Sequence, residues 1–296
     1  MNLTNKLNLP EAVVNAIVAA NEEYSRGNSA ISVSELLNPP RIIALRRRHQ
    51  SAIVEDVADL VYSLIGTTIH DKLEAASTVG ITEERLFTDV NGWRISGKFD
   101  HFHLADGRLT DYKMVTGWKV RDGQPNADFE AQLNVYAELL ELNGYTVKSL
   151  CNVCFIRDWS KRQAAREPTF PQQQVIVIDA PLWSRERRQA FLAARVALHQ
   201  AAQSEGATLP LCTPGERWAK RPAYAIKKKN RKRAIKLFDD RGAAASWVAA
   251  QMDNGDMYIE DRPAENIRCA LYCNVSPFCD FAAALPAQSN SEELSL

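Results

Sequence analysis

Apolar and polar positions follow regular periods along the first 200 residues, and these periods predict the main helices. The segment DFEAQLNVYAELLEL (128–142) predicts a helix that Asn143 and Gly144 end as a C-cap. The segment SRERRQAFLAARVALHQAAQ (184–203) predicts a long amphipathic helix with Ser184 as its N-cap. Between residues 51 and 77, apolar residues recur every three or four positions, which predicts a further helix: Ile53, Val57, Leu60, Val61, Leu64 and Ile65.

β-rich segments between these helices predict strands. The segments TVKSLCNVCFIRDW (146–159) and QQQVIVIDA (172–180) are of this kind. Asp106 and Gly107 separate WRISGKFDHFHL (93–104) from GRLTDYKMV (107–115), and Asp-Gly between two such segments favours a hairpin. A two-residue turn would pair Ala105 with Arg108, so that paired residue numbers sum to 213.

The pattern changes after about Gly206. The segment AYAIKKKNRKRAIKLFDD (223–240) predicts a basic hairpin, RGAAASWVAAQM (241–252) a helix and DMYIEDRP (256–263) a strand. We therefore expect three parts: residues 1–206, a small ββαβ unit within residues 207–284, and a disordered tail over residues 285–296.

The net charge of zero conceals two basic runs. One is RIIALRRR (41–48), and the other holds ten Lys or Arg and no acid between Arg217 and Lys236. Such runs are either solvated faces or contacts to a polyanion. No apolar run is long enough to cross a membrane and no secretory signal is visible, so we expect a cytoplasmic protein without a membrane partner.

The predicted hairpin gathers charged groups on one face. In the register above, Asp100 lies opposite Lys113 and Phe102 opposite Asp111. Because side chains alternate along a strand, Asp100, Asp111 and Lys113 share a face, while Tyr112, His101 and His103 point away. Two carboxylates suit Mg²⁺ or Mn²⁺, and a nearby ammonium can stabilise the charge of a phosphodiester transition state.

This pattern resembles the PD-(D/E)XK nuclease superfamily, in which an Asp on one strand precedes (D/E)-x-K on the next, here Asp100 and the DYK of Asp111 to Lys113. Two further segments resemble the RecB-like members: GTTIH (66–70) and QLNVY (132–136). The resemblance covers roughly residues 30–200. It implies an α/β restriction-endonuclease-like core, with a mixed central sheet flanked by helices.

The resemblance also implies roles for individual residues. Lys113 would handle the nucleophilic water, and Gln132 and Tyr136 would support the catalytic site. Glu74, one turn after His70, could support a ligand, bind a second metal or be only a solvated acid. The ligands of Mg²⁺ or Mn²⁺ would be His70, Asp100, Asp111 and the carbonyl of Tyr112.

Six cysteines in a cytoplasmic chain favour metal ligation over disulfides. Cys269, Cys273 and Cys279 form a C-x3-C-x5-C cluster that Cys212 could complete. The cluster resembles the C-terminal cysteines of RecB-like nucleases that bind [4Fe–4S]. In those proteins the first cysteine precedes the core, whereas SVSELLNPPRI (32–42) has none, so Zn²⁺ or no metal remain alternatives. We expect Cys151 and Cys154, on a strand, to be buried and structural.

The basic hairpin is either a solvated turn or a phosphate clamp on DNA. Its candidate DNA-binding residues are Lys227, Lys228, Lys229, Arg231, Lys232 and Arg233.

Together these features predict a metal-dependent DNA exonuclease of phage-type recombination or DNA repair, acting in the cytoplasm of a bacterial host if phage-encoded. Its partner would be DNA, with a single-strand annealing or recombination protein as a further candidate, and an oligomer is compatible with the sequence. The alternatives are a structure-specific endonuclease and an inactive DNA-binding protein with a nuclease fold.

Overall fold

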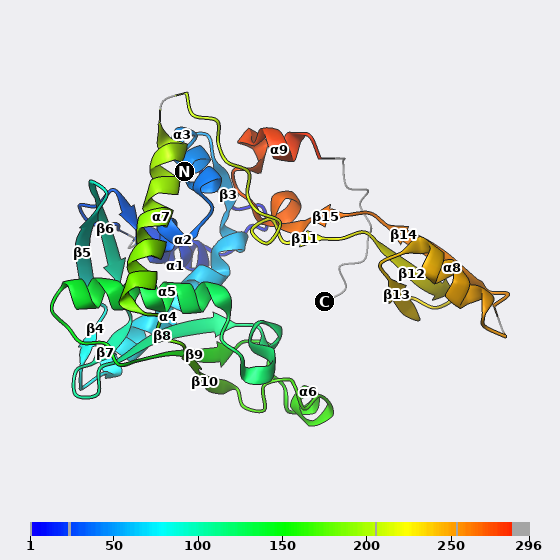
Figure 1. The fold of residues 1–296 in the computed structure, drawn as a ribbon, viewed down its shortest axis with the longest axis horizontal. Coiled ribbons are helices and arrows are strands. Elements are labelled where there is room, and N and C mark those ends of the chain that lie inside the picture. The colour runs from blue at the N-terminus through cyan, green and yellow to red at the C-terminus, as the bar shows by residue number, and fades with distance from the viewer. Residues whose placement is uncertain (1, 23–24, 205, 253, 286–296) are drawn as a thin grey trace. The chain divides into compact units, whose positions relative to one another are not determined.

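The computed structural model describes residues 2–22, 25–204, 206–252 and 254–285. The chain divides into two compact units at the bond between Leu209 and Pro210, and each unit is described by itself (Figure 1). The predicted tail falls almost entirely outside the described residues. No helix in the described part is long and apolar enough to cross a membrane.

A five-stranded mixed sheet forms the centre of the first unit, in the order β10-β9-β8-β7-β4. The β8–β9 pair is parallel and the other pairs are antiparallel. This is the mixed α/β fold that the sequence predicts. The strands are β4 (Ile81–Thr82), β7 (His101–His103), β8 (Arg108–Val115), β9 (Ser149–Ile156) and β10 (Val175–Ala180).

A second sheet and several helices complete this unit. The sheet has the order β2-β6-β5, formed by Ile31–Ser32, Trp93–Lys98 and Arg85–Val90. A short parallel pair joins β1 (Asn2–Thr4) to β3 (Val54–Asp56). The helices are α1 (Glu11–Glu22), α2 (Val33–Leu37), α3 (Pro40–Arg48), α4 (Val61–Ala76), α5 (Ala127–Leu142), α6 (Lys161–Arg166) and α7 (Arg185–Gln203), with 3-10 turns η1 (Val57–Leu60) and η2 (Gly117–Gly123).

Helices α5 and α7 form as the sequence predicts and contact the core together. Asn143 caps α5, and Gly144 follows with a φ of +91° that suits glycine. The Ser184 side chain accepts the amide of Arg187 at the start of α7. Arg188 on α7 is buried and donates to Glu138 of α5 at 3.0 Å, so that a buried ion pair joins the two helices.

The helix expected between residues 51 and 77 is shorter than the sequence predicts. It begins only at Val61, because residues 54–56 pair with β1 and the next four form a 3-10 turn. Ile53 and Val57 are buried before the helix begins, whereas no residue of α4 is fully buried. The apolar spacing therefore extends through a strand and a 3-10 turn, and spacing alone does not distinguish these from a helix.

The predicted hairpin register is wrong by two residues. Phe102 pairs with Leu109 and His103 with Arg108, so that Asp100 falls opposite Asp111 rather than Lys113. The turn spans four residues because Asp106 accepts the amide of Arg108 at 3.1 Å and Gly107, at φ +67°, donates to the carbonyl of His103. A shift of two preserves the faces, since side chains alternate with a period of two.

The first hairpin segment is also divided between two sheets. β6 ends at Lys98, and β7 begins at His101. β6 packs closely on α5 at Gly97, where an added Cβ would lie 2.8 Å from Leu139 and 2.9 Å from Tyr136. The intervening Phe99 is buried in the core, and the chain turns there into the central sheet, which places Asp100 at the junction.

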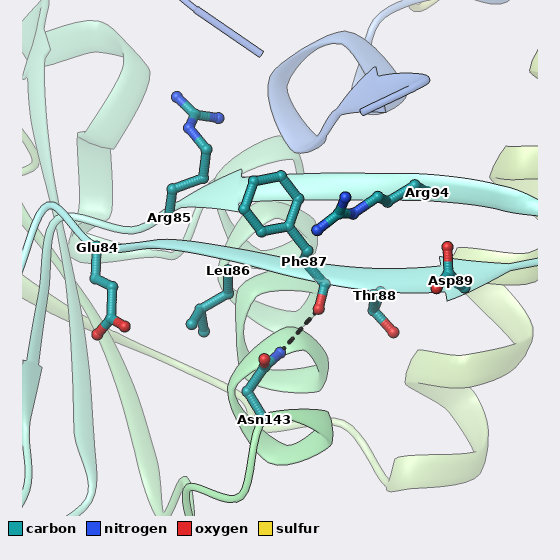
Figure 2. Close-up of a pocket in the computed structure, with 8 residues that line it drawn as sticks. All are labelled: Glu84, Arg85, Leu86, Phe87, Thr88, Asp89, Arg94 and Asn143. Atoms are coloured by element: carbon teal, nitrogen blue, oxygen red, sulfur yellow. Dashed lines mark hydrogen bonds between the residues drawn. The ribbon is translucent and has the colours of Figure 1, made fainter. Parts of the chain in front are cut away.

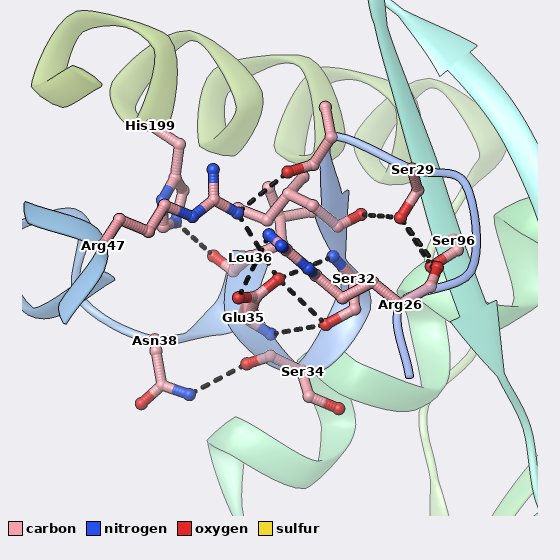
Figure 3. A network of polar contacts seen from close by, with 12 residues as sticks. Arg26, Ser29, Ser32, Ser34, Glu35, Leu36, Asn38, Arg47, Ser96 and His199 are labelled. Atoms are coloured by element: carbon pink, nitrogen blue, oxygen red, sulfur yellow. Dashed lines mark hydrogen bonds and ion pairs between the residues drawn. The ribbon is translucent and has the colours of Figure 1, made fainter. Parts of the chain in front are cut away.

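A half-buried polar network fixes α2 at the edge of this core (Figure 3). Ser32 and Glu35 form a capping box at the helix start. Glu35 also contacts Arg47 of α3 at 3.5 Å, and His199 of α7 donates from Nε2 to the carbonyl of Leu36 at 2.9 Å. The SVSELLNPP segment is thus held to two other helices by polar contacts.

The second unit contains the predicted ββαβ arrangement. Its sheet has the order β13-β12-β14, with β12 (Ala223–Lys228), β13 (Lys236–Phe238), α8 (Arg241–Ala249) and β14 (Met257–Arg262) in chain order. Beside it, β11 (Ala219–Lys220) pairs with β15 (Glu265–Asn266). Short helical turns follow: η3 (Arg268–Tyr272), η4 (Ser276–Phe278) and α9 (Asp280–Ala283).

Candidate metal centre

Three potential ligands converge in the first unit, each from a different segment. His70 lies on α4, Glu83 follows β4, and Asp100 lies between β6 and β7. Their ligand atoms all lie within 4.8 Å of one another, and this is the one such group of three among the described residues. His70 Nδ1 is 3.2 Å from Glu83 Oε1 and 3.5 Å from Asp100 Oδ1.

Glu83 joins the group through strand pairing. β4 and β7 pair Ile81 with Phe102 and Thr82 with His101, and the next residue, Glu83, donates its amide to the carbonyl of Asp100 at 3.1 Å. Its backbone adopts φ +51°, an uncommon conformation for a residue with a side chain. Glu83 Oε2 also lies 2.6 Å from Lys98 Nζ.

The carboxylates of this group are shielded from solvent. Asp100 is 9% exposed and accepts the amide of Tyr112 at 2.6 Å. Burial, with the nearby charge of Asp111, raises the pKa of Asp100 to about 7. Burial also opposes the ionisation of Glu83, but His70 and Lys98 outweigh it and lower its pKa. A bound cation would offset the cost of ionising carboxyl groups that are held out of water in this way.

The hydrogen bond to Glu83 is the main reason that the pKa of His70 is raised, and the charges of Asp100 and Glu83 add to it. Burial of His70 acts in the opposite direction. His70 therefore belongs electrostatically to the same group as the two carboxylates.

Asp111 and Lys113 lie beside this group on β8. Lys113 Nζ contacts both oxygens of Asp111, at 2.9 and 2.8 Å, and Asn152 of β9 donates to Asp111 Oδ2 at 2.8 Å. Burial opposes the charge of Lys113, but Asp111 and Asp100 outweigh it and raise its pKa. The Lys113 side chain is thus held against the Asp111 carboxyl group, within electrostatic reach of Asp100.

Other expected site residues occupy different positions around the group. The ring of Tyr112 meets His70 edge-on at 6.1 Å between centroids. Gln132 donates to the hydroxyl of Tyr136 at 3.3 Å, and burial together with the charges of Asp100 and Asp111 raises the pKa of Tyr136. Glu74 is exposed and does not belong to the three-residue group.

Two residues at this site carry no sequence motif. Glu83 lies in a short segment before β5, and Asn152 lies on β9 directly beside Asp111 in the parallel pairing. The signal that locates both is strand register, since each is the neighbour of a predicted aspartate on an adjoining strand. His101 and His103 make their contacts elsewhere, with the carbonyl of Val79 and with Asp106.

The four clustered cysteines lie in the second unit as half-buried free thiols. Burial raises the pKa of Cys212 to about 11, and the neighbouring Glu216, Cys269 and Cys273 add to the shift. Burial also raises the pKa of Cys269, with contributions from Cys273 and Cys279. The thiols are therefore neighbours, although no three of these described sulfurs lie within 4.8 Å of one another. Cys151 and Cys154 are buried on β9, as the sequence predicts.

The basic hairpin presents most of its cations to solvent. Lys227 contacts Glu260 of β14 at 2.8 Å, and Lys228 ends β12 in a half-buried position. The intervening turn has Asn230 at φ +67°. Its exposed cations are Lys229, Arg231, Lys232 and Arg233.

A separate hollow lies over β5 and β6, where the guanidinium of Arg94 covers the ring of Phe87 at 4.3 Å (Figure 2). Asn143 closes one side by donating to the carbonyl of Phe87 at 3.1 Å. Its lining residues do not include His70, Glu83 or Asp100.

A scan against protein-family models finds no match, and a search among curated proteins finds none. Among solved structures, the chain resembles SSO0001 with a TM-score of 0.46 and 16% identity, over 66% of this chain and 86% of that chain. It resembles a candidate exonuclease from Eubacterium rectale with a TM-score of 0.32 and 9% identity, over 51% of this chain and 59% of that chain. These likenesses are too distant to carry a functional argument.

Proposed function

We propose that this protein is a metal-dependent deoxyribonuclease that hydrolyses phosphodiester bonds as an exonuclease. The observation that carries the proposal is the convergence of His70, Glu83 and Asp100, with the Asp111–Lys113 pair beside them. One imidazole and two carboxylates accommodate Mg²⁺ or Mn²⁺.

The cation would be held by His70, Glu83 and Asp100, with Asp111 as a fourth ligand. When bound, it would supply a Lewis acid and lower the pKa of a coordinated water. Lys113 would hold the attacking water and stabilise negative charge on the phosphoryl oxygens. Asn152 would keep the Asp111 carboxylate in place through its hydrogen bond at 2.8 Å. Gln132 and Tyr136 support the site from α5.

For the second unit we propose a [4Fe–4S] cluster on Cys212, Cys269, Cys273 and Cys279. The C-x3-C-x5-C spacing of three of these residues, completed by Cys212, supplies the four thiolates that such a cluster takes. Anaerobically purified protein should be brown and hold iron, whereas stoichiometric zinc in a colourless protein would contradict this assignment.

Cleavage of end-labelled linear DNA and of closed circular DNA, with Mn²⁺ or with EDTA, tests the proposed activity. We expect Mn²⁺-dependent loss of the linear substrate alone. The proposed role of this activity is recombination or DNA repair in the cytoplasm. Lys113→Met should slow cleavage by roughly a hundredfold or more. Lys148→Met, an exposed lysine just before β9, is the matched control. Nicked circles would indicate an endonuclease, and binding without cleavage an inactive DNA-binding protein.

A further inference from the structure

Two large aromatic side chains remain exposed on the elements that carry the candidate metal centre. Tyr62 is 60% exposed on α4, the helix of His70. Trp118 is 53% exposed in η2, which directly follows β8 with Asp111 and Lys113. Large exposed aromatic rings offer faces on which nucleic-acid bases can stack.

Each of these rings is covered by a guanidinium. The Cζ of Arg157 lies 3.9 Å from the ring centroid of Tyr62, and the Cζ of Arg121 lies 4.9 Å from that of Trp118. Arg121 also donates to the hydroxyl of Thr169 at 2.9 Å. Both rings therefore combine an exposed π surface with a cation, which is the combination that binds stacked bases and their phosphates.

Further contacts connect this surface to the catalytic lysine. Arg157 follows β9 and donates its amide to the carbonyl of Val115, two residues after Lys113. The ring of Phe129 lies 4.4 Å from Lys119 Nζ and 5.4 Å from Lys113 Nζ. Lys119 and Lys113, the lysine proposed to act on the phosphate, thus contact the same aromatic ring.

The surrounding segments carry an excess of positive charge. Residues 116–123 and 156–169 hold six cations against three acids, Asp122, Asp158 and Glu167. Asp158 accepts the amide of Gly117 at 2.7 Å. Burial lowers the pKa of Lys119, and the nearby charge of Asp128 opposes that shift. The remaining excess is complementary to phosphates. The cations are Lys119, Arg121, Arg157, Lys161, Arg162 and Arg166.

We propose that Tyr62 and Trp118 form a stacking surface for the unpaired bases of a single DNA strand, next to the metal centre. In a duplex the faces of the bases are occupied by their neighbours, so only an unpaired strand can use these two rings. The cations beside the rings would contact the phosphates. This inference rests on the proposed nuclease function and names its substrate as single-stranded DNA.

Binding measured in EDTA tests this surface independently of cleavage. Fluorescence anisotropy of the full chain with a labelled oligothymidine and with a labelled blunt duplex gives the two affinities. Tyr62→Ala and Trp118→Ala should each weaken single-strand binding by roughly tenfold and leave duplex binding almost unchanged. Tyr62→Phe and Trp118→Phe should keep most of the affinity because they keep a ring.

Tyr258→Ala is the matched control, because Tyr258 is 45% exposed on β14 in the second unit. Thermal unfolding of each variant checks that it remains folded. Unchanged single-strand affinity in both folded alanine variants, or an equal loss for duplex and single strand, would overturn the inference. If the protein binds single strands selectively but does not cleave DNA, the stacking surface is supported and only the nuclease function is contradicted.

Discussion

At the scale of single residues, both carboxylate oxygens of Glu83 make contacts at the candidate metal centre. One oxygen lies 3.2 Å from His70 Nδ1 and the other 2.6 Å from Lys98 Nζ. The backbone amide of Glu83 donates a hydrogen bond to the Asp100 carbonyl and holds the residue in place. The positive φ of Glu83 is the conformational cost of this position. A strained residue at such a position is expected where its side chain has a function.

We predict that Glu83→Gln weakens Mn²⁺ binding by at least tenfold, because an amide replaces an anionic ligand of almost the same shape. Isothermal titration of the purified protein measures this. Glu84→Gln, the same change one residue later, should bind Mn²⁺ like the wild type. Equal affinities for the two variants would remove Glu83 from the ligand set.

The sequence brings Asp100, Asp111 and Lys113 to one face, and the structure places the three together. It does not indicate Glu83 or Asn152, because both reach the site through pairing between strands distant in sequence. His70 followed from its helix motif, whereas Glu74, one turn further, is exposed. Local spacing therefore identifies residues on one element or hairpin, and it misses those that tertiary pairing supplies.

At the scale of elements, Gly97 and Gly66 lie in opposite packing environments, one crowded and one open. Gly97 of β6 has no room for a Cβ beside Leu139 and Tyr136, whereas at Gly66 of α4 nothing lies within 4 Å. Gly97→Ala should lower the free energy of unfolding by about 1–3 kcal/mol, as overpacking does. Gly66→Ala should raise it by up to about 1 kcal/mol, because alanine favours helix. Urea unfolding measures both, and a stable Gly97→Ala variant would contradict the close packing.

The basic hairpin is predicted to contact DNA phosphates through its exposed turn. Replacing Lys229, Arg231, Lys232 and Arg233 by Gln should weaken DNA binding equally for every sequence. The slope of log affinity against log salt concentration should become shallower by about 0.9 for each lost duplex contact. Lys6→Gln with Lys148→Gln, two exposed lysines of the first unit that belong to neither proposed DNA contact, is the control and should leave the slope unchanged. An unchanged salt slope would mean that the turn is only solvated.

The sequence predicts the types of the elements well, and it predicts their boundaries and strand register less well. The strands β8, β9 and β10 and the helices α5 and α7 formed where periodicity predicted them. The hairpin register differed because the Asp106 side chain closes a longer turn. The start of α4 differed because β1 pairs with residues 54–56, a contact over about fifty residues that periodicity does not contain.

At the scale of the whole molecule, stability should depend on pH through His199. Its Nε2 donates to the carbonyl of Leu36, and burial above all, with Arg195 and Arg47 nearby, lowers its pKa to about 4. The unfolded histidine titrates near about 6.5, so the unfolded chain binds more protons between the two values. This contribution is complete above about pH 6.5 and is lost as pH falls toward 4, by about 3 kcal/mol at most.

His199→Gln should flatten that dependence, because glutamine does not titrate and its amide can donate to the same carbonyl. Urea unfolding at about pH 7 and about pH 5 compares the two proteins. The wild type should lose more stability than the variant between these conditions. Parallel losses would mean that other groups determine the acid sensitivity.

The central claim is that a divalent cation binds between His70, Glu83 and Asp100. Crystals grown with Mn²⁺ and measured at the manganese absorption edge test it most directly. We predict one strong anomalous peak within coordination distance, about 2.0–2.4 Å, of His70 and of both carboxylates. A peak at another position, or none at saturating Mn²⁺, would contradict the proposed metal centre.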